Sequence, residues 1–219
     1  MNTAPDRFFD KKFWFEENLR YSNPHFRLFK CANIIKALSR SKGRTCDLLD
    51  VGCGPATLAT LLPENIHYYG IDLAIHESAP NLKETDILKK PIEFEEKKFD
   101  FVVASGIFEY IGTQQHQKFL EIKTILKEGG HFIATFVNID HRHPLHAFNM
   151  YNNIIPIHEF LSDLRTVFHV DRYFPTSYNW HGSEPRKKYI LALNLHMNLN
   201  IPVIGPWLAV EFIFICSAK

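Results

Sequence analysis

The sequence predicts an α/β fold in which a mostly parallel sheet is flanked by helices. Apolar runs of strand length recur at 46–51, 66–72, 99–105 and 129–137, and near-continuous apolar runs are typical of parallel strands buried on both faces. The first run ends in a glycine-rich turn followed by a helical pattern, as in nucleotide-binding βα units. The 219 residues, 46% hydrophobic and 14% aromatic, are enough to bury the core of one such domain.

Residues 6–40 precede the first strand and are expected to be helical. Ser22-Asn-Pro breaks this region, because proline disfavours a helix in the residue before it. From His25 to Leu38 apolar residues recur close to the helical period. The aromatic residues between 8 and 15 are too apolar for a free tail, so we expect them to pack against the rest of the chain.

Residues 46–57 read Cys-Asp-Leu-Leu-Asp-Val-Gly-Cys-Gly-Pro-Ala-Thr and hold the turn. Pro55 suits the first position of the helix that follows, since its missing N–H would be unpaired there. Gly52 and Gly54 let the backbone approach a ligand without a Cβ in the way. The carboxylate of Asp50, at the carboxyl end of the strand, would repel a pyrophosphate and attract a cation.

Acidic residues follow the turn in an ordered series. The strand 66–72 ends on Asp72, and an acid about 20 residues after the first strand, at the tip of strand two, is placed to hold ribose hydroxyls. Asp86 follows in Glu-Thr-Asp-Ile-Leu. The glycine pattern by itself is incomplete, because it lacks the third glycine of the dinucleotide fingerprint. Asp72 and Asp86, following the glycine turn in order, strengthen the prediction of a nucleotide-like ligand.

Further elements are predicted along the rest of the chain. Between the second and third strong strands we expect a short helix, a short strand and a loop. Thr113 to Leu126 has apolar residues on one face and is expected to form a helix with Thr113 as its N-cap. Gly129 is expected to end this helix in a left-handed cap. Another strand is predicted near 168–174.

Charge and cysteine content narrow the class of protein. A net charge of +1 argues against nucleic acid as a partner, because no broad basic footprint exists. The four cysteines show no Cys-x-x-Cys pairing, which indicates reduced thiols and a cytoplasmic location. The apolar stretch 199–216 is interrupted by polar residues and prolines, so we predict no transmembrane segment. The polar N-terminus is unlike a signal peptide.

The ordered motifs between residues 44 and 138 resemble those of the class I S-adenosylmethionine-dependent methyltransferases. The resemblance implies a Rossmann-like, doubly wound sheet of seven strands, mostly parallel with an antiparallel last strand at 210–218, and helices on both faces. It implies S-adenosyl-L-methionine as cofactor and S-adenosyl-L-homocysteine as product. We therefore expect one methyltransferase domain, 1–219, with an N-terminal helical lid (1–43), a cofactor-binding core (44–138) and a substrate-side and C-terminal sheet region (139–219).

The resemblance also assigns cofactor-binding residues. The turn after Asp50 would wrap the methionine part, Asp72 would bind the ribose hydroxyls, and Asp86 would meet the adenine amino group. Arg27 in the lid could reach the cofactor carboxylate, although the N-terminal helices could equally only cover the sheet. Cys53 is expected to pack and to have no chemical role. The full cofactor-binding set is Asp50, Gly52, Cys53, Gly54, Asp72, Leu73, Asp86, Ile87, Ser105, Gly106, Tyr21 and Arg27.

The catalytic candidates are His141, His143 and Tyr110. The histidines belong to a loop that leaves a strand's carboxyl end and therefore faces the ligand crevice. Either histidine, or Asp140, could remove a proton from the acceptor, since imidazole titrates near neutral pH; ordinary loop packing is the alternative. Tyr110 stands where many relatives have a histidine, so no histidine base is assumed there. No metal site is expected, because the histidines lack matching acids.

The residues expected on the substrate side are Phe108, Tyr178, Trp180 and His181. Phe108 would contribute to an apolar pocket. The other three lie in an aromatic and polar segment at 173–188, and family substrate specificity usually resides in this C-terminal region. A surface hairpin followed by a basic helix is the alternative for this segment.

The sequence thus predicts S-adenosylmethionine-dependent methyl transfer to a small-molecule or sugar-like acceptor, by O- or N-methylation. Protein, tRNA and lipid acceptors stay as alternatives. One rival function is a non-catalytic protein that binds the methionine cofactor. The other is a nicotinamide-dependent oxidoreductase, against which the carboxylate of Asp50 and the incomplete glycine fingerprint argue.

Overall fold

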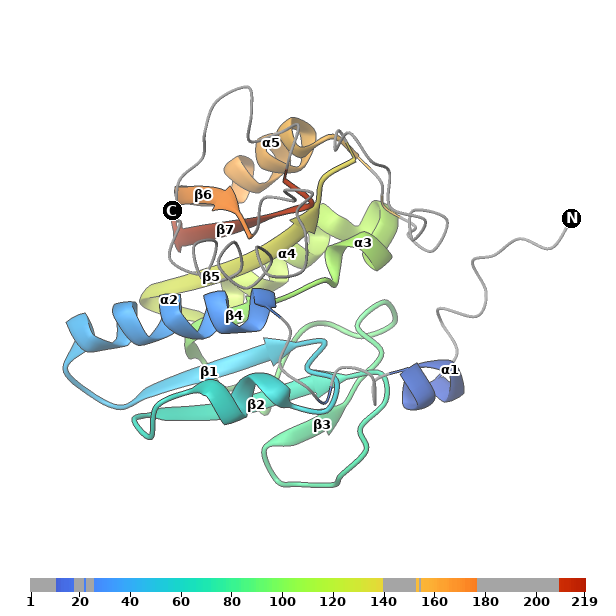
Figure 1. Cartoon of the computed structure of the whole chain (residues 1–219), viewed down its shortest axis with the longest axis vertical. Coiled ribbons are helices and arrows are strands. Elements are labelled where there is room, and N and C mark those ends of the chain that lie inside the picture. The colour runs from blue at the N-terminus through green and yellow to red at the C-terminus, as the bar shows by residue number, and fades with distance from the viewer. Residues whose placement is uncertain (1–10, 18–21, 23–25, 140–152, 154, 177–208) are drawn as a thin grey trace, which may run out of the picture.

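A seven-stranded sheet runs through the computed structural model, which describes residues 11–17, 22, 26–139, 153, 155–176 and 209–219 (Figure 1). The strands are β1 (Cys46–Val51), β2 (Ile66–Asp72), β3 (Leu82–Glu84), β4 (Phe99–Ala104), β5 (Leu126–Val137), β6 (Phe168–Pro175) and β7 (Glu211–Ala218). Their order in the sheet is β3-β2-β1-β4-β5-β7-β6. β7 pairs antiparallel with both β5 and β6, and the other pairs are parallel. The predicted fold class is confirmed.

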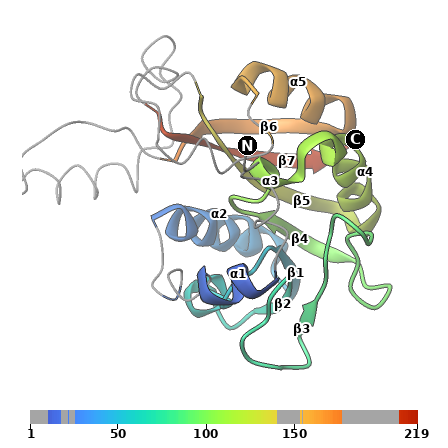
Figure 2. The ribbon, with the colours of Figure 1, turned by 90° about the vertical axis from the view of Figure 1, so that its right-hand side faces the viewer.

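Helices cover both faces of this sheet (Figure 2). They are α1 (Lys11–Glu17), α2 (Phe26–Lys42), α3 (Phe108–Ile111), α4 (Gln115–Ile125) and α5 (Ile157–Val167), with 3₁₀ turns η3 (Thr57–Leu61) and η4 (Gly112–Gln114). Alternate residues of β4 serve the two faces. Phe101 packs in the core formed with α2, and Val102 packs in the core formed with α4 and α5. In the described part of the chain, no helix is both long and apolar enough to cross a bilayer.

The glycine turn departs from the predicted helix start. The N–H of Ala56 donates to the carbonyl of Cys53 at 2.9 Å and closes a turn that contains Pro55. Ala56 has a φ of 57°, in the left-handed region, and only then does the short 3₁₀ turn η3 begin. Pro55 is therefore not the first residue of a helix, and that expectation is wrong.

The predicted ends of α4 also need correction. Thr113 lies within η4, and α4 begins at Gln115 without a side-chain cap. The helix ends at Ile125, because Leu126 already pairs with Phe99 in the sheet. Gly129 has the expected positive φ, 65°, but it lies inside β5, beside a shift in register. Its left-handed conformation therefore accompanies the shift in register within β5 and does not end a helix.

Two other elements differ from expectation. The stretch between β2 and β4 contains the predicted short strand, β3, but no helix, and the structure describes all of it. α5 was not predicted. Its buried apolar residues nevertheless recur at helical spacing, so the signal was present in the sequence: they are Ile157, Phe160, Leu161, Leu164 and Val167.

A buried carboxylate ties the amino ends of the central strands together. Asp100 is fully buried at the start of β4. It accepts hydrogen bonds from Arg44, from the N–H of Asp47 at 3.0 Å and from Lys127 at 2.9 Å. Burial alone would raise the pKa of this carboxyl, but the hydrogen bonds from Arg44, Asp47 and Lys127 lower it to about 2. The network joins β1, β4 and β5 at the edge opposite the strands' carboxyl ends.

Asp100→Asn should lower the free energy of unfolding at neutral pH by about 2 kcal/mol, because it removes a carboxylate that is ionised more readily in the folded chain than in the unfolded one. Since the folded pKa is depressed, this stabilisation is present above the unfolded pKa and is lost as pH falls toward about 2. Urea unfolding at pH 7 and pH 3 measures it. Glu84→Gln, which removes an exposed ion pair with Lys11, is the control and should change stability by less than about 1 kcal/mol. Equal losses in both variants would contradict the prediction.

Candidate functional site

A cavity lies beyond the carboxyl ends of β1, β2 and β4. Every predicted cofactor-binding residue that the structure describes is on its wall: Asp50, Gly52, Cys53, Gly54, Asp72, Leu73, Asp86, Ile87, Ser105, Gly106 and Arg27. Tyr21 lies outside the described residues. The sheet topology explains this convergence, because parallel neighbours β2, β1 and β4 deliver their last residues to one edge.

The glycine turn is held rigidly against β2. The carbonyl of Ile71 accepts the N–H of Gly52 at 2.8 Å and that of Cys53 at 3.1 Å. Gly52 has a φ of 74°, and a Cβ placed on it would lie 1.9 Å from the side chain of Ile107. Both the conformation and the space therefore require glycine here.

Cys53 fills the space behind the turn. A Cβ on Gly70 of β2 would lie 2.7 Å from its Sγ, so the sulfur packs directly on that backbone. Burial raises the pKa of the thiol well above its ordinary value, which keeps it protonated and poorly nucleophilic. These observations support the packing role expected for Cys53.

Asp72 braces the turn from the tip of β2. Its Oδ2 accepts the N–H of Gly54 at 2.8 Å, and its Oδ1 accepts the N–H of Ala74 at 3.0 Å. A carboxylate has about four lone-pair sites, so Asp72 can accept more hydrogen bonds than these two. The arrangement is compatible with the predicted contact to ribose hydroxyls.

Asp86 lies on the loop after β3 and is likewise oriented by its own loop. Its Oδ1 accepts the N–H of Leu88 at 3.1 Å, and its Oδ2 is 2.8 Å from Nζ of Lys89. Asp86 thus turns the chain so that Ile87 and Leu88 also line the cavity. Its contact with an adenine amino group stays a prediction.

The ionisation of Asp50 is sensitive to what occupies the cavity. Its side chain is buried at the end of β1, where the hydroxyl of Tyr68 donates to it at 2.9 Å. Burial raises the pKa of this carboxyl to about 7, and the nearby Asp72 adds to the effect, while Tyr68 and Arg27 oppose it. A cationic group of a ligand would favour the ionised form.

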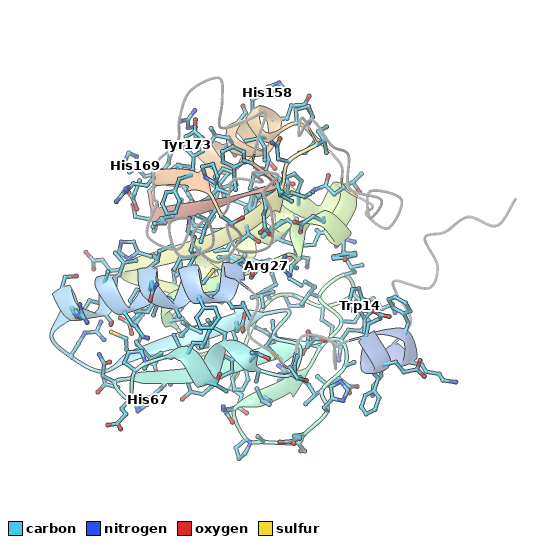
Figure 3. All side chains as sticks on the ribbon, in the orientation of Figure 1. Trp14, Arg27, His67, His158, His169 and Tyr173 are labelled. Atoms are coloured by element: carbon cyan, nitrogen blue, oxygen red, sulfur yellow. The ribbon has the colours of Figure 1, made fainter. Side chains whose placement is uncertain are left out.

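Arg27 reaches the cavity from the first turn of α2. A Cβ on Gly106 would lie 2.6 Å from its guanidinium, so the two are in close contact. Its Nη1 donates to Glu211 at 3.1 Å. Figure 3 labels Arg27 together with Trp14 of α1, which also lines the cavity. The two N-terminal helices therefore each contribute a wall residue.

Trp14 and Glu109 were not singled out from the sequence. Trp14 makes an edge-on contact with the catalytic candidate Tyr110, with ring centroids 5.2 Å apart, and both residues are on the cavity wall. Glu109 lines the cavity too, although it is 97% buried. No local pattern marks either residue, because the tertiary positions of α1 and α3 bring them to the cavity.

Of the other candidates for catalysis and substrate contact, the structure describes Phe108 alone. Phe108 is fully buried, with its ring 4.7 Å from that of Phe119, and is absent from the cavity wall. Its assignment to the substrate side is therefore wrong, because the apolar core takes its ring. The remaining candidates lie outside the described residues: Asp140, His141, His143, Tyr178, Trp180 and His181. Within the described ranges, no three His, Cys, Asp or Glu side chains are grouped to hold a metal ion.

Among the residues that the structure describes, three buried polar atoms of the cavity wall have no hydrogen-bond partner: Oγ1 of Thr85, Oγ of Ser105 and Oε2 of Glu109. A buried polar group without a partner costs about 1–3 kcal/mol. Together with the acids and the glycine backbone, these atoms fit a polar ligand that carries both hydrogen-bonding and cationic groups.

Comparisons with known proteins bear on what this ligand is. Residues 49–134 match the family model described as a methyltransferase domain. Similar solved structures include a S-adenosylmethionine-dependent methyltransferase from Clostridium acetobutylicum, 12% identical, with a TM-score of 0.61 over 93% of this chain and 96% of that one. The chain has the class I methyltransferase fold. The resemblance inferred from the sequence is confirmed.

Two further methyltransferase structures are similar over nearly their whole length. The N-methyltransferase NodS from Bradyrhizobium japonicum, solved with S-adenosyl-L-homocysteine, is 14% identical, with a TM-score of 0.57 over 96% of this chain and 100% of that one. The methyltransferase CcbJ from Streptomyces caelestis is 12% identical, with a TM-score of 0.63 over 99% and 98%. The comparison with curated proteins returns no match. At these identities the methyltransferase likeness concerns the fold.

Glu109→Gln should make the folded chain more stable at pH 8, by on the order of 2 kcal/mol, and less so at pH 5. Burial, and then the nearby Glu211, raise the pKa of Glu109 from 4.5 to about 7. Because the folded pKa is raised, wild-type stability falls as pH rises from about 4.5 through about 7, and glutamine removes that loss. Thermal unfolding at both pH values measures the difference, with Glu84→Gln as the control. A variant destabilised equally at both pH values would contradict this expectation.

Proposed function

We propose that the protein transfers a methyl group from S-adenosyl-L-methionine to a small-molecule acceptor, such as a sugar-like compound, on oxygen or nitrogen. The observation that carries the proposal is the cavity wall, where a glycine turn of fixed backbone meets acids from successive strand ends. Asp50, Asp72 and Asp86 line one cavity in the order in which the family's motifs occur.

Each part of the wall has chemistry suited to one part of this cofactor. The turn at Gly52 and Gly54 and the ionisable Asp50 would hold the amino-acid end, whose ammonium group favours a carboxylate. Asp72 would accept hydrogen bonds from the ribose hydroxyls, and Asp86 with Ile87 would receive the adenine. When bound, the cofactor supplies a methyl group on a positively charged sulfur.

The protein's own contribution is mainly to position the acceptor and to exclude water. Proximity and orientation can supply about 7–11 kcal/mol in favourable cases. Trp14 and Tyr110 give the cavity an aromatic wall. The near-neutral net charge supports a small acceptor over nucleic acid. We keep the prediction of a cytoplasmic protein, and the four free, buried cysteines support it.

Asp72→Ala should weaken S-adenosyl-L-homocysteine binding by at least about tenfold, because it removes an acceptor and releases the N–H of Gly54, and hydrogen bonds to charged groups are worth about 1.5–3 kcal/mol. Glu84→Ala is the matched control, since Glu84 pairs with Asp72 in register on β3 but does not line the cavity. Isothermal calorimetry compares the two variants with the wild type.

The same titrations separate the rival functions. A folded wild-type chain that binds neither S-adenosylmethionine nor its demethylated product would refute the proposal and favour a nicotinamide cofactor, which the same instrument can test. Saturable binding without turnover of any acceptor would favour the non-catalytic alternative. Protein, tRNA and lipid acceptors are screened by transfer of labelled methyl groups.

Gly52→Ala should weaken cofactor binding more than it destabilises the fold. Gly52 and Gly43 both have positive φ, so alanine costs each about 1–2 kcal/mol of backbone strain. A Cβ on Gly43 meets open space, whereas one on Gly52 displaces Ile107, which lines the cavity. We expect both variants to melt below the wild type, Gly52→Ala somewhat lower because Ile107 must move, and we expect weaker S-adenosyl-L-homocysteine binding in Gly52→Ala alone. Unchanged binding in Gly52→Ala would argue against the turn as the cofactor site.

A further inference from the structure

Glu109 lines the cavity, anchors one carboxylate oxygen and leaves the other without a hydrogen-bond partner. Its Oε1 accepts the N–H of Val137, at the end of β5, at 3.0 Å. Its backbone carbonyl accepts the N–H of Asn153 at 2.9 Å. Its Oε2 is buried and has no hydrogen-bond partner. The residue lines the cavity and is 97% buried, and the bonds at Oε1 and at its backbone carbonyl hold it in place.

The charged residues of the cavity wall favour a ligand group of positive charge. Among the described residues of the cavity wall, Arg27 is the one cation, and the acids are Asp50, Asp72, Asp86 and Glu109. Arg27 is already paired with Glu211 at 3.1 Å, and Glu211 lies opposite Val137 in the sheet. The proposed cofactor contacts engage the three aspartates and leave Glu109 unassigned. A negatively charged group beside Oε2 would be repelled, and a positively charged one attracted.

Two aromatic residues of the cavity wall are also suited to a cation. Trp14 of α1 and Tyr110 of α3 meet edge-on, and both line the cavity that Glu109 lines. Aromatic rings attract ammonium groups through their electron-rich faces, most strongly where water is excluded. The carboxylate and the rings therefore favour the same chemical class.

We propose that Glu109 binds the protonated amine of the methyl acceptor and takes up its proton, which makes the acceptor an amine. This inference rests on the proposed methyltransferase function and narrows it to N-methylation. In the proton transfer, an N–H bond breaks, its electron pair stays on nitrogen, and the proton forms an O–H bond at Oε2. The nitrogen then has the lone pair that a methyl acceptor needs. Burial and Glu211 raise the pKa of Glu109 to about 7, which suits exchange of a proton near neutral pH.

Three small compounds with one skeleton test this inference by binding alone. Benzylamine, benzyl alcohol and benzoate carry positive, neutral and negative groups on the same aromatic ring. Calorimetry at about pH 8, on protein saturated with S-adenosyl-L-homocysteine, should show benzylamine binding at least tenfold more tightly than the other two. Glu109→Gln should abolish this preference, and Glu84→Gln, outside the cavity, should keep it. Benzylamine binding to the wild type should strengthen as pH rises through about 7, and this dependence should be absent in Glu109→Gln.

The outcomes distinguish this inference from the proposed function. S-adenosyl-L-homocysteine binding to wild type and to Glu109→Gln is measured first, which also shows that the variant is folded. If the wild type does not bind it, the proposed function fails. If it binds, the inference alone is overturned by any of three results: no preference for benzylamine, no binding of any of the three compounds at millimolar concentration, or a preference that persists in Glu109→Gln.

Discussion

The pairing of β1 with β2 is the constraint on which the site depends. Their parallel register continues past the strand ends, where the carbonyl of Ile71 accepts two successive N–H groups of the glycine turn. The carboxylate of Asp72 then fixes Gly54 from the same strand. Because these bonds come from backbone and from a strand terminus, the turn needs no long helix behind it. The 3₁₀ turn at Thr57–Leu61 is sufficient.

The pKa values of buried carboxylates are lowered at the amino ends of the strands and raised at the carboxyl ends. At the amino ends, Asp100 has enough donors to hold its pKa at about 2, so its charge stabilises the fold. At the carboxyl ends, Asp50 and Glu109 have too few donors to offset burial, and the pKa of each rises to about 7. The site therefore carries a cost in stability that a ligand can relieve. Such an imbalance is typical of functional sites.

The sequence predicted the features that depend on local pattern and strand order. Apolar runs located β1, β2 and β4, and the acids at their ends followed from the rule that parallel strands deliver their carboxyl ends to one edge. Positions decided by tertiary contact were not predictable. Gly129 was expected to cap a helix because a glycine after a helical pattern usually does so. The sequence does not reveal that Leu126, three residues earlier, already pairs with Phe99 in the sheet. Phe108 was placed on the substrate side because an aromatic residue next to a motif gives no sign of which core will take its ring.

The error at Phe108 also explains how Glu109 reaches the cavity. Successive residues of a helix point about 100° apart, so neighbours on the single turn α3 cannot face the same way. Phe108 is fully buried against Phe119 and Phe160, and this packing fixes the rotation of α3. Glu109 is then turned toward the end of β5, where Val137 anchors one oxygen, and Tyr110 toward the ring of Trp14. The aromatic core thus orients the polar wall of the cavity, and the chemistry of that wall depends on a residue that never touches it.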